Sequence, residues 1–74
     1  LALRGEFEEA IRAYQIALRL NPEHADARFG LGAALLQTGA RVEAVHEFEK
    51  LLDQKPDYPG LKAVLAQLGS EGNR

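Results

Sequence analysis

The sequence predicts an all-α fold of antiparallel helix-turn-helix repeats, an α-solenoid fragment of about four helices. Residues 5–22 and 39–56 carry one pattern at a constant offset of 34 positions. The matched positions are small, apolar or aromatic: Gly5 and Gly39, Ala10 and Ala44, Ile11 and Val45, Tyr14 and Phe48, Leu18 and Leu52, Pro22 and Pro56. No strand pattern is evident. Units repeated at this length bury apolar surface against their neighbours, so we expect an extended binding surface rather than a catalytic pocket.

Residues 6–20 are expected to form the first amphipathic helix. Its apolar residues are spaced three and four apart, which gathers them on one face: Phe7, Ala10, Ile11, Tyr14, Ala17 and Leu18. Asn21-Pro22 ends this helix, because the residue before a proline is displaced from the α region. Pro22 can then open the next helix, where its missing N–H costs nothing.

The segment from Ala25 to Thr38 is expected to be a helix with little side-chain bulk. Inside a helix, Gly30 and Gly32 each cost about 1 kcal/mol relative to alanine. Such a cost suggests that the backbone approaches a flanking helix closely. For Gly30, an exposed glycine that is merely tolerated is an equally open alternative. Gly39 is expected to end the helix in the left-handed conformation.

The segment from Arg41 to Gln54 repeats the amphipathic pattern, with these residues facing inward: Ala44, Val45, Phe48, Leu51 and Leu52. Pro56 and Pro59 bracket the next junction. A last helix is expected from Pro59 to Leu68, with Gly69 ending it and residues 69–74 forming a flexible tail. Its apolar face holds Leu61, Val64, Leu65 and Leu68.

These residues make the chain resemble the tetratricopeptide repeat (TPR) family, whose unit is two antiparallel helices with a glycine-led turn and a junction proline. The complete copy carries Leu31-Gly32, Ala44, Phe48 and Pro56 at the family positions. The resemblance divides residues 1–68 into a partial repeat (1–22), a complete repeat (23–56) and a partial repeat or capping helix (57–68).

Three details of the resemblance can be tested by the structure. It implies that Leu1 to Leu3 end a first helix and that Arg4-Gly5-Glu6 form a turn. Arg28 stands where the family often has Trp. Arg41 stands where the first copy has the aromatic Phe7, so we expect Val42 to pack in its place.

The resemblance also implies a concave partner-binding groove, lined by the first helices of successive units. By position, its residues are Asp26, Phe29, Ala33, Leu36, Gln37, Ala63 and Gln67. Phe29, Ala33 and Leu36 are spaced by four and three, which makes a connected apolar strip of the kind that marks an interaction site. The alternative is that Phe29 and Leu36 are covered by the chain's own helices or by a second copy. Tyr58 either flanks this groove or, as we expect, packs onto the next helix.

The groove strip also bears on the kind of ligand. Some TPR co-chaperones clamp a terminal carboxylate with basic and Asn residues, but Phe29 and Ala33 stand at those positions. The resemblance therefore favours an apolar segment or an amphipathic helix as the ligand.

Composition argues against several other functions. The net charge is −2 and the Lys and Arg residues are scattered, so there is no basic stripe for a nucleic acid. The apolar runs are too short to cross a membrane. There is no Cys, one Ser and one Thr, so we expect no nucleophilic enzyme and no cofactor. The sequence does not indicate a compartment.

The strongest alternative to the binding hypothesis is a metal site. Glu43 and His46 have the i, i+3 spacing used in di-iron bundles. However, Val45 and Phe48 are expected to occupy the inward face, so Glu43, His46 and Glu47 should be solvated. We therefore expect no metal.

The sequence thus predicts a non-catalytic protein–protein interaction scaffold. The chain has no Met and begins within a helical pattern, so we interpret it as part of a longer array. Cutting an array exposes an apolar face, and the helix from Phe7 to Leu20 is then expected to pair with another copy of the chain. Two alternatives stay open: a self-association module, and a substrate-presenting segment of a multidomain enzyme, like the TPR arms of some glycosyltransferases.

Overall fold

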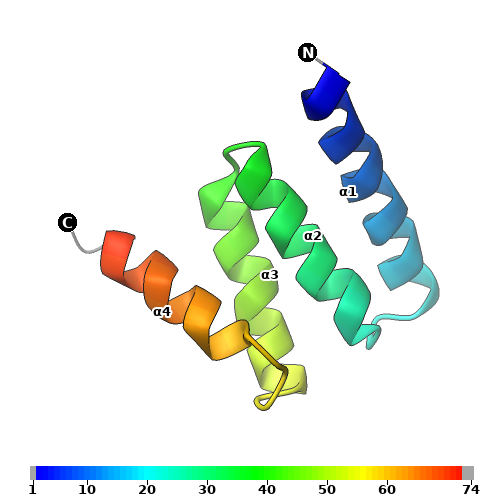
Figure 1. Cartoon of the computed structure of the whole chain (residues 1–74). Coiled ribbons are helices and arrows are strands. Elements are labelled where there is room, and N and C mark those ends of the chain that lie inside the picture. Colours follow the sequence, from blue (N-terminus) through cyan, green and yellow to red (C-terminus); the bar gives the residue numbers. More distant parts are fainter. Residues whose placement is uncertain (1, 73–74) are drawn as a thin grey trace.

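The computed structural model describes residues 2–72, and its side chains are described over residues 5–69. Four helices follow one another: α1 (Ala2–Leu20), α2 (Ala25–Gln37), α3 (Arg41–Gln54) and α4 (Leu61–Gly72). Consecutive helices run antiparallel, with α2 between α1 and α3, and α4 against α3 (Figure 1). No strand occurs among residues 2–72. The predicted all-α helical repeat is confirmed.

The turn between α2 and α3 has the conformation that the sequence predicted. Gly39 has a φ of +88°, in the left-handed region where only glycine is unstrained. Its N–H donates to the Leu36 carbonyl at 3.1 Å, and the Ala40 N–H donates to the Leu35 carbonyl at 2.9 Å. These two bonds form a Schellman motif, which satisfies carbonyls at the end of α2 and folds the chain back.

The start of α2 differs from the expectation for Pro22. The helix begins at Ala25, and its N-cap is His24, whose Nδ1 accepts a hydrogen bond from the Ala27 N–H at 3.2 Å. Pro22 lies in the turn before this cap. The imidazole nitrogen satisfies one of the free N–H groups of the first turn, so the helix can start later than the proline.

The outer ends of the terminal helices also differ from the predictions. α1 runs without interruption through Gly5, so the turn predicted at residues 4–6 is wrong. Gly5 lies within this helix, where a glycine costs about 1 kcal/mol relative to alanine but does not by itself end the helix. α4 continues through Gly69 to Gly72, so the helix end predicted at Gly69 is also wrong. Residues 73–74 of the predicted tail lie outside the described residues.

The core lies between α2, α3 and α4. Its buried cluster comprises Ala44, Phe48, Leu51, Leu61 and Leu68. These side chains lie on the faces that the helical spacing predicted to be inward. The side chain of Phe48 is only 1% exposed, and it is the central residue of the complete repeat.

Both glycines of α2 admit aromatic rings from neighbouring helices. A Cβ at Gly32 would lie 2.6 Å from the Phe48 ring, and one at Gly30 would lie 2.5 Å from the Tyr14 ring. Tyr14 and Phe48 are equivalent residues of the two copies. The glycine at position 30 is therefore not a tolerated exposed residue, because it makes the same kind of close approach as Gly32.

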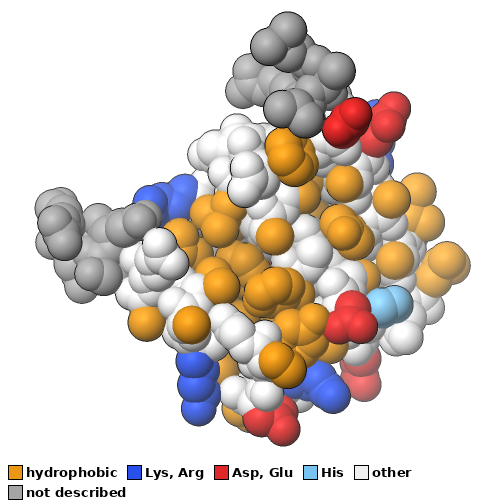
Figure 2. Space-filling view, viewed as in Figure 1, with side chains coloured by type: hydrophobic (Ala, Val, Ile, Leu, Met, Phe, Trp, Pro, Cys, Tyr) orange, Lys and Arg blue, Asp and Glu red, His pale blue; other side chains and the backbone are white. Residues whose placement is uncertain are grey.

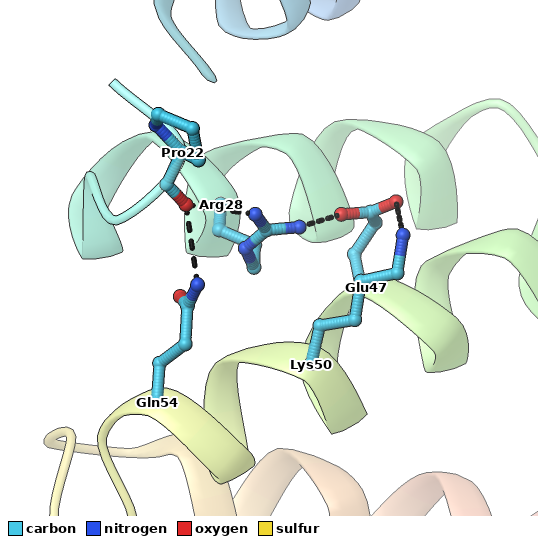
Figure 3. A network of polar contacts seen from close by, with 5 residues as sticks. All are labelled: Pro22, Arg28, Glu47, Lys50 and Gln54. Carbon is cyan, nitrogen blue, oxygen red and sulfur yellow. Dashed lines mark hydrogen bonds and ion pairs between the residues drawn. The ribbon is translucent and has the colours of Figure 1, made fainter. Parts of the chain in front are cut away.

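A polar network ties the junction before α2 to α3 (Figure 3). Arg28 donates through Nη1 to Glu47 Oε1 at 2.8 Å and through Nη2 to the Pro22 carbonyl at 2.9 Å. Gln54 Nε2 donates to the same carbonyl at 3.2 Å, and Lys50 Nζ lies 3.8 Å from Glu47 Oε2. The side chains of Arg28 and Glu47 are 11% and 17% exposed. Glu47 is thus not solvated as predicted, because the long guanidinium group at the family's Trp position reaches it.

For the other α3 residues to which the sequence assigned a role, some predictions agree with the structure and one does not. Glu43 and His46 are exposed, as expected. Val42 is 69% exposed, so it does not replace the aromatic packing residue of the first copy. Its position one residue later in the helix is rotated by about 100° from that of Arg41, which carries it away from α2.

Candidate binding groove

The apolar strip predicted on α2 is present as a partly exposed surface. Phe29, Ala33 and Leu36 are half-buried, whereas the other four candidate groove residues are exposed: Asp26, Gln37, Ala63 and Gln67. Phe29 and Leu36 also pack against the buried core. The covering that we considered as an alternative is therefore partial. Each side chain contacts the core and leaves part of its surface accessible.

Tyr58 brings the junction after α3 onto one end of this strip. Its ring centroid lies 5.1 Å from that of Phe29, which in turn lies 5.4 Å from that of Phe48. The Tyr58 hydroxyl donates to Asp26 Oδ1 at 2.6 Å. The side chain thus flanks the candidate groove and links two of its predicted residues.

The contact with Asp26 changes the acidity of the tyrosine. The hydrogen bond to the carboxylate stabilises the neutral phenol and raises the pKa of Tyr58 above its ordinary value of 10.0. Desolvation and repulsion between a phenolate and the carboxylate act in the same direction. The raised pKa favours the neutral phenol, which is the form that donates this hydrogen bond.

A pocket of about 380 Å³ joins α2 to α4 at the other end of the strip. Its lining residues are Leu36, Arg41, Val64, Gln67 and Leu68. Arg41 Nη2 donates to the Leu68 carbonyl at 2.8 Å, which holds the start of α3 against α4. Two predicted groove residues, Leu36 and Gln67, are thus brought to one pocket.

A smaller pocket of about 210 Å³ lies between α1 and α2. It contains two further candidates, Ala33 and Gln37, and its other lining residues are Phe7, Ala10, Tyr14, Gly30 and Ala34. The repeat relates the two pockets: Phe7 and Ala33 are equivalent to Arg41 and Gln67. The other three candidates, Asp26, Phe29 and Ala63, line neither pocket.

The face of the molecule drawn in Figure 2 agrees with this geometry. Figure 2 shows apolar side chains gathered over the middle of the view, between the positions of α4 and α1 in Figure 1. Charged side chains lie mainly around the edge of this area. Such an arrangement, with an apolar centre and a polar rim, is typical of interaction sites.

The sequence did not single out Arg41, Val64 and Leu68 as lining residues of the groove. Their repeat equivalents Phe7, Gly30 and Ala34 line the α1–α2 pocket. Adding 34 to these residue numbers therefore identifies the three residues in the α2–α4 pocket. The carboxylates and histidines form no group of three that could hold a metal within the described part of the chain. In the same part, no helix is long and apolar enough to cross a bilayer.

Comparison with known proteins agrees with the repeat and its geometry. A family model described as tetratricopeptide repeat matches residues 4–59, more than half of the chain. The chain is also similar to the tetratricopeptide repeat and J domain-containing co-chaperone DNJ1 of Fusarium oxysporum f. sp. lycopersici. The two are 34% identical over 65 residues, which cover 88% of this chain but only 12% of that relative.

No solved structure matches the chain. The match of the family model and the paired antiparallel helices lead to the same conclusion. This chain belongs to the tetratricopeptide repeat family.

Proposed function

We propose that the chain is a non-catalytic interaction module that binds an apolar segment or amphipathic helix of a partner protein in the groove of α2 and α4. Tetratricopeptide repeats generally mediate protein–protein interactions and are typically non-catalytic. The observation that carries the finer proposal is the half-exposed strip on α2, which is continuous through Leu36 with the pocket containing Gln67. The substrate-presenting alternative would use the same surface.

The polar groups of the groove favour such a ligand over a terminal carboxylate. Asp26 places a negative charge at one end, where it would repel a carboxylate. The strip itself contributes Phe29, Ala33 and Leu36, none of which can donate a hydrogen bond from its side chain. A helix with apolar residues spaced by three and four can instead cover the strip, with its polar residues contacting Gln37 and Gln67.

Leu36→Glu is expected to weaken the binding of helical peptides at least about tenfold, equivalent to about 1.4 kcal/mol. The substitution places a charge at the point where the strip meets the α2–α4 pocket. The probe is a set of peptides about 20 residues long, selected for binding to the intact chain from a displayed random library, and fluorescence polarisation gives the affinity.

Two further variants make this result interpretable. Leu20→Glu is the matched control, because Leu20 is 82% exposed on α1 and lies outside both groove pockets. Gln67→Arg tests the groove at an exposed position, where loss of folding is not expected. Circular dichroism checks that each variant keeps its helices. Equal affinity of the selected peptides for the wild type, Leu36→Glu and Gln67→Arg would contradict the proposed groove.

The hydrogen bond at the end of the groove predicts a pH dependence. In a Tyr14→Phe background Tyr58 is the only tyrosine, and its ultraviolet absorbance should titrate above pH 10. Asp26→Ala should lower the pKa of Tyr58 toward its ordinary value, because it removes the hydrogen bond and the repulsion and leaves only the desolvation. Because the pKa is raised on folding, the stabilisation is fully present below pH 10 and is lost as pH rises through the raised pKa. Identical titrations with and without Asp26 would refute the contact.

A further inference from the structure

One end of the apolar strip differs in chemistry from the rest of the groove. The side chains of Phe29 and Tyr58 are half-buried there, and their ring centroids lie 5.1 Å apart. Asp26 is exposed beside them, and its Oδ1 accepts the hydrogen bond from the Tyr58 hydroxyl at 2.6 Å. We call these three residues the Asp26 end of the groove. It combines a partly accessible aromatic surface with a carboxylate.

The charge of Asp26 is not neutralised by the chain itself. Among residues 5–69, whose side chains the structure describes, no Lys, Arg or His forms an ion pair with it. Glu47 shows the contrast, because its carboxylate lies 2.8 Å from Arg28 and 3.8 Å from Lys50. The carboxylate at the Asp26 end is therefore available to a cation from outside the chain.

Tyr58 determines which kind of polar group can bind at this end. Its hydroxyl proton is donated to Asp26, and its raised pKa favours the neutral form that donates. A carboxylate only accepts hydrogen bonds, so the Asp26 end offers acceptors and a ligand must supply the donor. The bond also orients the carboxylate before a ligand arrives, which reduces the cost of ordering it on binding.

The aromatic surface favours a basic side chain over other donors. Lysine and arginine pack a methylene stem along apolar surface while they keep a charged head in a polar environment. Phe29 and Tyr58 provide the surface for such a stem, and Asp26 receives the head. A hydroxyl or amide of the ligand would bring a donor without the positive charge, and a carboxylate would be repelled.

The distance along α2 relates this end to the α2–α4 pocket. Asp26 and Leu36 are ten positions apart in one helix, which corresponds to about 15 Å along its axis. A ligand helix alongside α2 spans this distance with about two to three turns. The Asp26 end is formed by α2 and the α3–α4 junction, and each of these has a described helix on both sides in the sequence.

We propose that the Asp26 end is a subsite for a lysine or arginine of the ligand. The ligand is then an amphipathic helix with a basic residue about two to three turns from the apolar residue that reaches Leu36. Asp26 binds the charged head, and Tyr58 is a positioning residue that holds the carboxylate. This inference rests on the proposed function of the groove. Because Asp26 is exposed, the subsite contributes more to specificity than to affinity.

Paired peptides test the subsite directly. The probes are the library-selected peptides whose binding Leu36→Glu weakens, each made with its basic residue and with Met in that place. Met keeps an unbranched stem and removes the charge. The wild type should prefer the basic form about threefold, as expected for an exposed ion pair. Asp26→Asn should abolish the preference, although its amide oxygen can still accept from Tyr58.

Glu23→Gln is the matched control for general electrostatic attraction. Glu23 is an exposed carboxylate three positions before Asp26 and is not part of the strip. Its loss should leave the preference for the basic form unchanged. Salt at about 1 M should reduce the preference of the wild type, because it screens an exposed pair.

Two further variants test the assigned roles. Asp26→Lys should reverse the preference, so that a peptide with Glu in place of its basic residue binds more tightly than the basic form. Tyr58→Phe keeps the ring but removes the hydroxyl that holds Asp26. It should reduce the preference for the basic form and leave the affinity of the Met form unchanged. A merely structural role of Tyr58 would weaken both forms equally.

The outcomes separate the subsite from the groove. If peptides sensitive to Leu36→Glu carry no basic residue, or bind the wild type and Asp26→Asn with the same preference, the subsite is refuted and the groove stands. Equal effects of Glu23→Gln and Asp26→Asn would indicate general attraction by negative charge and would also refute it. If Leu36→Glu weakens no selected peptide, the groove fails and the subsite fails with it.

Discussion

Replacing Phe48 with alanine is expected to unfold most of the chain at room temperature. The residue is 1% exposed, its ring lies against Gly32, and the ring centroid lies 5.4 Å from that of Phe29 in a tilted arrangement. Removing a buried phenylalanine costs about 3–5 kcal/mol. Small domains are commonly stable by only about 5 kcal/mol or little more, so this loss removes most of the available stability.

Urea denaturation followed by circular dichroism measures this effect. Tyr14→Ala is the matched control, because Tyr14 is the repeat equivalent of Phe48 and is only half-buried. Its loss of stability should be clearly smaller than that of Phe48→Ala. If the two variants lose the same free energy, or if Phe48→Ala unfolds like the wild type, the core does not lie where the structure places it.

Glu47→Leu is expected to have the second large effect, a loss of about 3–5 kcal/mol. The substitution leaves the charge of Arg28 in a largely buried site without its carboxylate. Arg28 Nε is already buried without a hydrogen-bond partner, so the guanidinium group would keep only its bond to the Pro22 carbonyl. The attraction that offsets its desolvation would be lost.

A double variant separates this explanation from a simple loss of packing. Adding Arg28→Met to Glu47→Leu removes the buried charge, and most of the stability should return. The Pro22 carbonyl still accepts a hydrogen bond from Gln54 in that variant. Lys50→Ala, which removes the exposed and more distant cation, should change stability by about 0.5 kcal/mol or less. A double variant as unstable as Glu47→Leu would disprove the charge argument.

The order and pairing of the helices could be predicted because the repeat fixes them redundantly. Two copies of one pattern locate the inward positions twice, and Gly39 marks the turn through a conformation that only glycine adopts without strain. The helix ends at Gly5 and Gly69 could not be predicted in the same way. A glycine can end a helix or lie within it, and the outcome depends on whether following residues pack back onto the preceding helix.

Part of the candidate groove was also foreseeable. The strip of Phe29, Ala33 and Leu36 follows from spacing along one helix. The contacts that shape the groove join residues far apart in sequence: Tyr58 and Asp26 are separated by 32 positions, and Arg41 and Leu68 by 27. The position of Glu47 on its helix likewise predicted a solvent-exposed side chain. This side chain is instead largely buried, because the long side chain of Arg28 reaches it. Side-chain reach between helices is a tertiary property that periodicity does not contain.

Gly30 and Gly32 of α2 affect the shape of any longer array that contains this repeat. Since α2 contributes no side chain at these points, the rings of Tyr14 and Phe48 set its separation from α1 and from α3. In stacked repeats, small rotations between neighbours accumulate into superhelical curvature. The size of this aromatic residue therefore affects the spacing between the helices of a repeat, and through that spacing the curvature of the array. The glycine-and-ring contact that stabilises the fold thereby also influences the width of the inner surface of such an array.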